Sequence, residues 1–198
     1  SLAAYRSAQT RFRLVGTTTT SWTSDISIDD WRIENGSNCI QTISCLPHTE
    51  TFDSFTLCGN TVFSCISDNS CGLINGWSNA GGDDIDWSVD NAGTPSSNTG
   101  PASDHTSGSG KYLFTEASSC YSQEAVLLSP CYNLSVVVQP EVSFWYNMNG
   151  AAMGNLVFSV STNQGSTWST IWSINGNKGT AWQEATISLN SFANQTVL

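Results

Sequence analysis

The side chains best suited to chemistry in this 198-residue sequence are aspartates that recur in short motifs. They stand at Asp29 and Asp30 in SIDD, at Asp53, at Asp83, Asp84 and Asp86 in DDIDW, and at Asp104 in SDHT. A hard cation such as Ca²⁺ takes six to eight oxygen ligands from carboxylates, carbonyl groups and water. These motifs favour a structural cation site, and the alternative is that the acids are solvated or hydrogen-bond within turns.

Alternation along one predicted strand offers separate support for a buried carboxylate. Ile26 and Ile28 alternate with Asp25, Ser27 and Asp29. If the two isoleucines face inward, Asp30 faces inward as well, because alternate residues of a strand share a face. A buried carboxylate requires a cation or hydrogen-bond donors. We therefore expect Asp30 to point into the sandwich.

Patterns typical of catalysis are missing from the sequence. There is no GxSxG nucleophile elbow, and the GSGK run at 108–111 lacks the spacing of a phosphate-binding loop. His105 stands beside Asp104, yet no nucleophile motif accompanies the pair. Scattered acids such as Glu116 could form a glycosidase pair, but loop acids of this kind more often bind metals. We predict that the chain is not an enzyme.

Eight tryptophans raise the question of carbohydrate binding, because aromatic faces stack on sugar rings. Trp145 and Trp182 stand in apolar strands, and we expect them in the core. Trp22 lies in a threonine-rich loop and Trp168 follows a turn, so these two are the candidate glycan or interface aromatics.

Charge excludes some classes of partner. Sixteen acidic residues against six basic ones give a formal net charge of −10. Nucleic acid and anionic membranes both attract basic surfaces, so neither is expected as a partner. No apolar run reaches the about 18 residues that a membrane-spanning helix needs, and membrane insertion is not expected.

The seven cysteines predict an oxidising compartment. Zinc sites use CxxC pairs or histidine partners, and that spacing is absent. Disulfides are the better explanation, although seven is an odd number and the connectivity cannot be deduced from sequence. The candidate disulfide cysteines are Cys39, Cys45, Cys58, Cys65, Cys71, Cys120 and Cys131.

Short strands separated by turns account for most of the remaining sequence. Strand-like patterns occur at 11–15, 25–29, 111–115, 142–146, 156–160, 171–174 and 182–189. The strands at 156–160 and 171–174 should form a hairpin across the NQGS turn. The stretch 91–110 is nearly free of large apolar residues and must be a long loop that needs anchoring by a metal or a covalent bridge. The pattern indicates an all-β protein with an antiparallel sandwich or barrel.

Several of these motifs together resemble a MAM domain, the module found in meprin-type proteases, receptor phosphatases and neuropilin-like receptors. The resemblance runs through CGLINGWSN (71–79), DDIDW (83–87), the DHT-containing stretch 94–118, AVLLSPC (125–131) and VSFWYNMNGAAMGNLVFSV (142–160).

The closing segment of such a domain, a sequence like DIAIDD, stands at the start of the chain. It lies within RFRLVGTTTTSWTSDISIDDWRIENGS at 11–37. We therefore interpret residues 1–38 as the C-terminal part of one MAM-like repeat. Residues 39–198 are then a linker, a disulfide loop and the N-terminal bulk of the next repeat. These motifs most resemble the tandem MAM-like repeats of large bacterial surface adhesins. Residues 1–38 could pack on their own chain or on a neighbour.

The resemblance implies a jelly-roll-like β-sandwich in which the N-terminal segment supplies the closing strands. It also implies one structural Ca²⁺ held by Asp53, Asp86, Asp104 and either Asp29 or Asp30.

The function implied is that of a non-catalytic, extracellular structural or adhesive repeat at the cell surface, in an adhesin or a filament. Its expected partners are neighbouring copies placed head to tail, with surface glycans or proteins as further partners. The alternative is a glycan-binding module appended to a secreted hydrolase.

Overall fold

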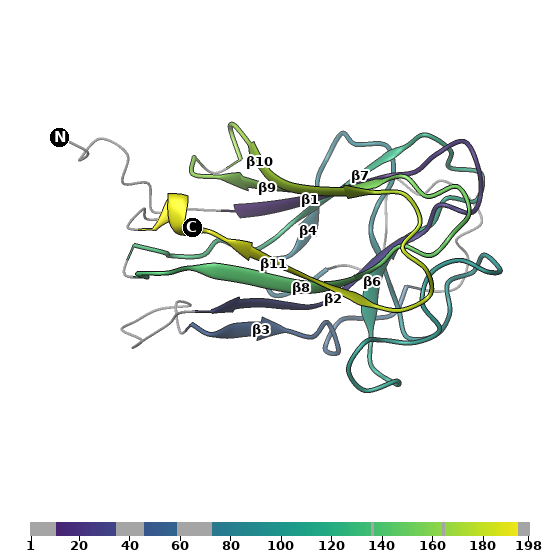
Figure 1. The fold of residues 1–198 in the computed structure, drawn as a ribbon, viewed down its shortest axis with the longest axis horizontal. Helices are drawn as coiled ribbons and strands as arrows, with labels where there is room; N and C mark the ends of the chain where they lie inside the picture. Colours follow the sequence, from purple (N-terminus) through teal and green to yellow (C-terminus); the bar gives the residue numbers. More distant parts are fainter. Residues whose placement is uncertain (1–10, 35–45, 59–72, 136, 164, 194–198) are drawn as a thin grey trace.

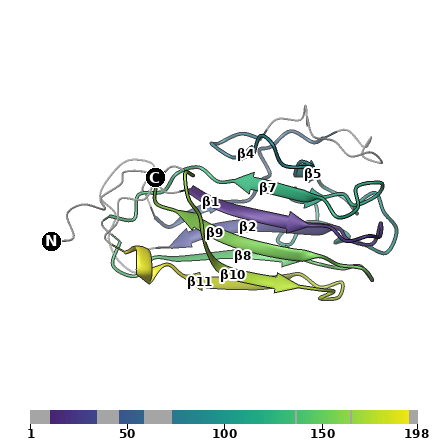
Figure 2. The same ribbon diagram turned by 90° about the horizontal axis from the view of Figure 1, so that it is seen from above.

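Two antiparallel sheets face one another in the computed structural model, which describes residues 11–34, 46–58, 73–135, 137–163 and 165–193. The two layers are seen edge-on in Figure 1 and from above in Figure 2. The predicted all-β sandwich is confirmed. Its strands are short because turn-forming residues interrupt the sequence every few positions.

The first sheet has five strands in the order β10-β9-β1-β7-β4. Their bounds are β1 (Arg11–Thr17), β4 (Ser78–Asn79), β7 (Glu124–Leu128), β9 (Asn155–Ser161) and β10 (Ser169–Asn175). Strands β9 and β10 pair antiparallel as the predicted hairpin, with a register shift between Thr170 and Trp172.

The second sheet has six strands, and five of them follow the order β11-β8-β2-β6-β5. Their bounds are β2 (Ile26–Glu34), β5 (Ser88–Asp90), β6 (Tyr112–Thr115), β8 (Glu141–Asn147) and β11 (Gln183–Ser188). The sixth strand, β3 (His48–Glu50), pairs with the second half of β2. A single 3-10 turn, η2 (Asn190–Phe192), follows β11.

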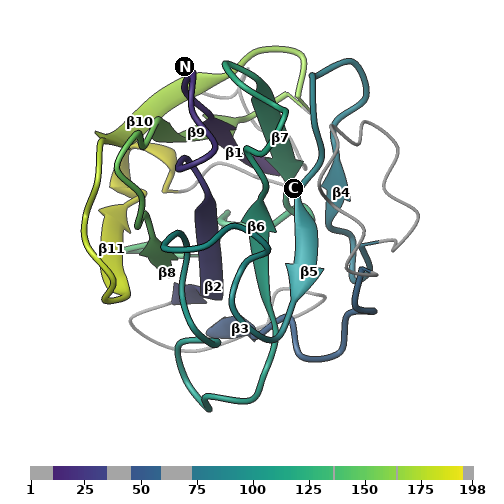
Figure 3. The same cartoon turned by 90° about the vertical axis from the view of Figure 1, so that its right-hand side faces the viewer.

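The N-terminal segment supplies one central strand to each sheet of its own chain. β1 lies between β9 and β7, and β2 lies between β8 on one edge and β6 and β3 on the other. Figure 3 shows both strands enclosed by later parts of the chain. The expectation that this segment completes a sandwich is confirmed, and the division into repeat pieces 1–38 and 39–198 stays a prediction.

An aromatic cluster joins the two sheets. Phe12 of β1 stacks on Phe158 of β9 at 5.4 Å between ring centroids, and Trp31 of β2 stacks on Phe144 of β8 at 5.6 Å. Phe144 and Phe158 in turn lie 5.9 Å apart, across the interface between the sheets. All four rings are fully buried. Half of this central packing therefore comes from β1 and β2.

A bulge in β2 changes which residues face the core. The pairing of β2 with β8 shifts register between Asp29 and Arg32, and Asp30 has a φ of 48°. An extra residue in one strand reverses the alternation beyond it. Trp31 therefore packs in the core with Ile28, and Asp30 does not point inward. The prediction of an inward Asp30 is wrong for this reason, and Asp29 is the buried carboxylate, at 1% exposure.

The loop spanning 91–110 is confirmed, and it covers the outer face of the second sheet. His105 stacks on Trp145 with 3.7 Å between ring centroids, and the indole nitrogen of Trp182 donates a hydrogen bond to the carbonyl of Ser103 at 3.1 Å. The prediction that Trp145 and Trp182 are core residues is wrong. Phe144 occupies the inward position of β8, so its neighbour Trp145 faces outward, and the loop covers it.

Gly154, directly before β9, leaves no room for a side chain. A Cβ there would fall on the carbonyl oxygen of Thr17 at the end of β1. We expect Gly154→Ala to lower the free energy of unfolding by about 1–3 kcal/mol, because the added methyl forces the paired strands apart. Gly81→Ala is the matched control, since nothing lies within 4 Å of a Cβ there. Urea denaturation checks both, and equal effects of the two changes would contradict this account.

Candidate cation site and surface groove

The bulge in β2 and the covering loop meet at Asp29 and Asp30. The buried Asp29 accepts hydrogen bonds from the backbone N–H of Asp30 at 2.8 Å and of His105 at 2.9 Å. The carboxylate of Asp30 contacts the Nδ1 atom of His105 at 2.7 Å and accepts from the hydroxyl of Thr106. His105 therefore anchors the loop through its backbone, its ring nitrogen and its stacking on Trp145.

Asp104 organises the tip of the same loop. One oxygen accepts from the backbone N–H of Ser107 at 2.7 Å and from its hydroxyl at 3.0 Å, and the other accepts from the N–H of Gly110 at 2.8 Å. Burial tends to raise the pKa of Asp104, but the N–H groups of Ser107 and Gly110 outweigh it, and the pKa lies below its ordinary value. The carboxylate of Asp104 is therefore held ionised.

Asp53 approaches Asp104 over the backbone of Gly110. A Cβ on Gly110 would contact Oδ1 of Asp53 and lie 3.0 Å from Oδ2 of Asp104, so only a glycine leaves space for both carboxylates. Asp53 accepts from the N–H of Lys111 at 2.9 Å and from the hydroxyl of Thr51 at 3.0 Å. Two of the residues predicted as metal ligands are thus brought together.

The pKa of Asp29 depends on the charges of Asp30 and Asp104, so Asp29 belongs to the same group of acids. Burial raises the pKa of Asp29 to about 8; the N–H groups of His105 and Asp30 oppose the rise, and the charges of Asp30 and Asp104 add to it. Burial and the charges of Asp30 and Asp104 therefore disfavour the ionised form of Asp29 where the β2 bulge meets the loop. Such a place favours a proton or a cation.

The DDIDW segment contains three further acids, the predicted metal ligand Asp86 and its neighbours Asp83 and Asp84. Asp83 accepts from the N–H of Val126 at 2.6 Å and Asp84 from the N–H of Glu124 at 2.9 Å, so both fasten the segment to β7 of the first sheet. Asp86 is half-buried in this segment. Within the described ranges, no three His, Cys, Asp or Glu side chains form a metal-binding group. A cation at Asp53 and Asp104 would take its remaining ligands from carbonyl oxygens and water.

A second carboxylate pair, Asp25 and Glu116, was missed by the sequence reasoning. Asp25 directly precedes β2, Glu116 directly follows β6, and the pairing of Ile26 with Thr115 makes them neighbours. Burial, followed by the charge of Glu116, raises the pKa of Asp25 to about 7. Only the register of β2 against β6 could have signalled this pair.

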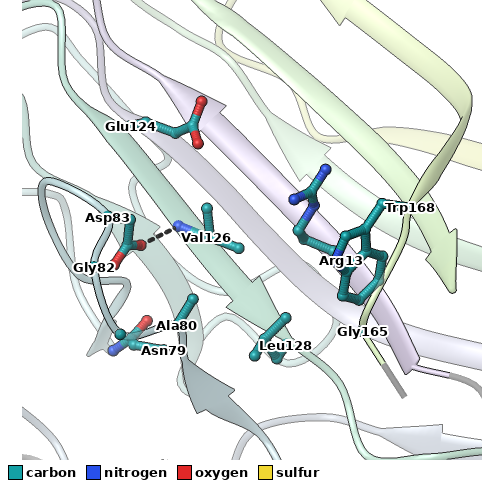
Figure 4. Close-up of a pocket in the computed structure, with 11 residues that line it drawn as sticks. Arg13, Asn79, Ala80, Gly82, Asp83, Glu124, Val126, Leu128, Gly165 and Trp168 are labelled. Carbon is teal, nitrogen blue, oxygen red and sulfur yellow. Dashed lines mark hydrogen bonds between the residues drawn. The ribbon is translucent and has the colours of Figure 1, made fainter. Parts of the chain in front are cut away.

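A groove of about 430 Å³ lies on the outer face of the first sheet. Val126 and Leu128 of β7 form its floor, with Asp83 and Glu124 on one side and Arg13 and Trp168 on the other (Figure 4). The guanidinium of Arg13 lies 4.8 Å from the centre of the Trp168 ring, a cation–π contact. Trp168 is half-buried in this wall, whereas Trp22 lies in its loop with 44% of its surface exposed.

The cysteines lie only partly within the described residues. Cys120 is buried, Cys131 is half-buried, and Cys58 packs against the core. The remaining four, Cys39, Cys45, Cys65 and Cys71, lie outside the described residues. The pairing of the seven cysteines stays a prediction.

A two-sheet antiparallel sandwich with a long loop fastened by carboxylates is consistent with a jelly-roll-like module. The chain belongs to the MAM family, since the family model described as "MAM domain, meprin/A5/mu" matches residues 64–198. The resemblance stated from the sequence motifs is confirmed at the level of the family. The origin of the repeat in a bacterial adhesin stays a prediction.

Two curated relatives share part of the chain. Neuropilin-1a of Danio rerio is 43% identical over 74 residues, which is 35% of this chain and 8% of the relative. Thyroid hormone-induced protein B of Xenopus laevis is 36% identical over 89 residues, which is 44% of this chain and 12% of the relative. The matches therefore span about a tenth of either relative's length. No solved structure gives a significant match.

MAM domains occur in extracellular or cell-surface proteins and are generally non-catalytic adhesion modules, which fits the expected location and class of this chain. None of the helices in the described part of the chain has the length and apolar character needed to cross a membrane.

The buried acids predict an unusual dependence on pH. The folded-state pKa values of Asp25 and Asp29, about 7 and 8, lie above the ordinary value of 3.8, so each contributes stability that is lost as the pH rises through the folded value. With a chelator present, we expect the thermal midpoint to fall by several degrees between pH 5 and pH 8. Differential scanning calorimetry checks this, and Asp29→Asn should flatten the profile. A midpoint that rises over the same range would contradict the pKa directions.

Proposed function

We propose that the chain is a structural and adhesive repeat of a cell-surface adhesin or filament, stabilised by disulfides and by a Ca²⁺ ion at Asp53, Asp104 and the β2 bulge. The observation that carries the proposal is the MAM-family match over 64–198, joined to a sandwich that β1 and β2 complete. Its partners are neighbouring copies placed head to tail, together with surface proteins or glycans.

The arrangement of the N-terminal strands constrains how copies meet. Because β1 and β2 are paired on both edges within their own chain, a neighbour does not need to donate them. Copies in an array then associate through loops and outer faces rather than through open sheet edges. A bound cation would make the loop over the second sheet rigid, which would favour such contacts.

The cation supports adhesion by fixing the loop. Asp53 belongs to the turn after β3 and Asp104 to the covering loop, so an ion between them joins two segments far apart in the sequence. Carbonyl oxygens and water would complete a coordination number of six to eight. The charges of Asp30 and Asp104, which raise the pKa of Asp29, add to the attraction.

Beads coated with the chain test the proposal together with its cation. We expect Ca²⁺ to cluster the beads and to raise the thermal midpoint by about 5 °C at saturating concentration, and a chelator to reverse both. Asp104→Asn should abolish the clustering and reduce the thermal gain, because it removes a negative ligand.

Glu184→Gln on β11 is the matched control, since it also replaces a carboxylate by an amide, at an exposed position that supplies none of the proposed ligands. The proposal is wrong if the coated beads cluster equally with and without Ca²⁺, or fail to cluster and bind no cell surface.

The groove favours a second candidate, a glycan-binding module. Its apolar floor and the Trp168 edge suit the C–H face of a pyranose ring, and the Glu124 carboxylate and Arg13 guanidinium suit its hydroxyls.

Trp168→Ala tests the glycan hypothesis on an array of neutral oligosaccharides. We expect the affinity for any bound saccharide to fall about tenfold, the usual value of one aromatic contact. Trp22→Ala is the control, because Trp22 is exposed and does not line the groove. If Trp168→Ala and Trp22→Ala bind a saccharide with equal affinity, recognition lies on another surface. If the parent chain binds no saccharide on the array, the glycan hypothesis is wrong.

A further inference from the structure

Asp25 and Glu116 form a buried pair of acids at the end of the β2–β6 ladder. They flank the paired residues Ile26 and Thr115, so their side chains are held side by side by the sheet itself. Asp25 is 0% exposed and Glu116 is 4% exposed. The pair is separate from the group at Asp53 and Asp104, because different segments of the loop cover the two places.

Glu116 has an oxygen that the protein leaves unsatisfied. Its Oε1 atom accepts from the hydroxyl of Ser96 and from the N–H of Ser118, both at 2.8 Å. Its Oε2 atom is buried and has no hydrogen-bond partner among the described residues. A buried carboxylate oxygen without a donor is strongly disfavoured. A proton or a bound cation at this oxygen would remove the cost.

Among the described residues, no basic side chain supplies the missing charge. In the part of the chain that the structure describes, no lysine, arginine or histidine nitrogen forms an ion pair with Asp25 or Glu116. Asp25 accepts from the N–H of Ala117 at 3.0 Å and from the hydroxyl of Thr99 at 2.5 Å.

The loop segment 94–99 places more oxygen atoms here than hydrogen-bond donors can satisfy. The Thr99 hydroxyl oxygen lies 2.5 Å from Asp25, 2.8 Å from the Ser96 carbonyl and 3.2 Å from the Thr94 hydroxyl, yet it has one proton. The Thr99 carbonyl also faces inward, where it accepts from Thr94 at 3.0 Å. Two carboxylates, two carbonyls and several hydroxyls make the oxygen-only set that Ca²⁺ prefers.

The backbone holds these oxygens in place. Asn98 and Gly100 both adopt left-handed conformations, with φ of 59° and 57°. A Cβ on Gly100 would fall on the side chain of Thr94, so the segment closes tightly on itself. A preformed arrangement of this kind loses little entropy when an ion binds.

We propose that Asp25 and Glu116, with the inward oxygens of residues 94–99, form a second Ca²⁺ site, distinct from the one at Asp53 and Asp104. The ion contacts the unsatisfied Oε2 atom of Glu116 and neutralises the pair. It fixes the first half of the covering loop as the other site fixes the second half. Burial raises the pKa of Asp25 because it disfavours the ionised carboxylate, and the charge of the bound ion would offset that cost. This site does not depend on the proposed adhesive function.

Calorimetric titration of the chelator-treated chain with CaCl₂ at pH 7.5 tests the site. We expect Glu116→Gln to bind one calcium ion fewer per chain than the parent, whereas Glu184→Gln binds the same number as the parent. The amide oxygen of the new glutamine can still accept from Ser96 and Ser118, so the fold should persist, and circular dichroism checks it. If Glu116→Gln does not fold, Asp25→Asn serves as the second variant.

The Asp104→Asn background separates the two sites. We expect this variant to keep one calcium ion and a Ca²⁺-dependent rise in its thermal midpoint that is smaller than the parent's, and the further change Glu116→Gln to remove both. If Asp104→Asn binds no calcium, or if Glu116→Gln leaves the stoichiometry unchanged, the second site is refuted. In that case the buried pair shares a proton. Failure of bead clustering alone leaves this result unaffected.

Discussion

The burial of carboxylates beneath a loop with few apolar side chains is the constraint on which this sandwich depends. Residues 91–110 have few apolar side chains to pack, and they are fastened by hydrogen bonds to Asp25 before β2, to Asp29 and Asp30 in β2, and to Glu116 after β6. The acceptors come from the sheet and most of the donors from the loop. The loop is therefore ordered only when the sheet beneath it is correctly registered.

Fastening the loop with carboxylates places several acids close together in a chain that is already acidic. With six basic residues against sixteen acidic ones, few lysines or arginines are available to neutralise buried acids, and Lys111 uses its ammonium group on the carbonyls of Asp53 and Phe55. Protons and cations remain as the counter-charges. If the proposed calcium sites are occupied, protons and cations compete for the same oxygens, and the stability of the loop then depends on both pH and calcium.

Local patterns predicted the longer strands because alternation and turn residues are short-range signals, but they did not predict β7 or the short strands β3, β4 and β5. Phe12 and Leu14 identified β1, and the hairpin of β9 and β10 followed from its turn. The meeting of Asp53 with Asp104 came from family motifs, since they are 51 positions apart in the printed sequence. The inward Asp30 was wrong because a bulge is invisible in the pattern. The Asp25–Glu116 pair needed the register of β2 against β6, which is a long-range property.

The central position of β1 and β2 also has a mechanical consequence. An N-terminal strand at a sheet edge can peel away under tension by breaking one row of hydrogen bonds at a time. Here each strand is bonded along both edges, and its aromatic side chains Phe12 and Trp31 are clamped in the core. A pull on the segment must break several rows of hydrogen bonds together, so the domain resists stretching as one unit until it ruptures.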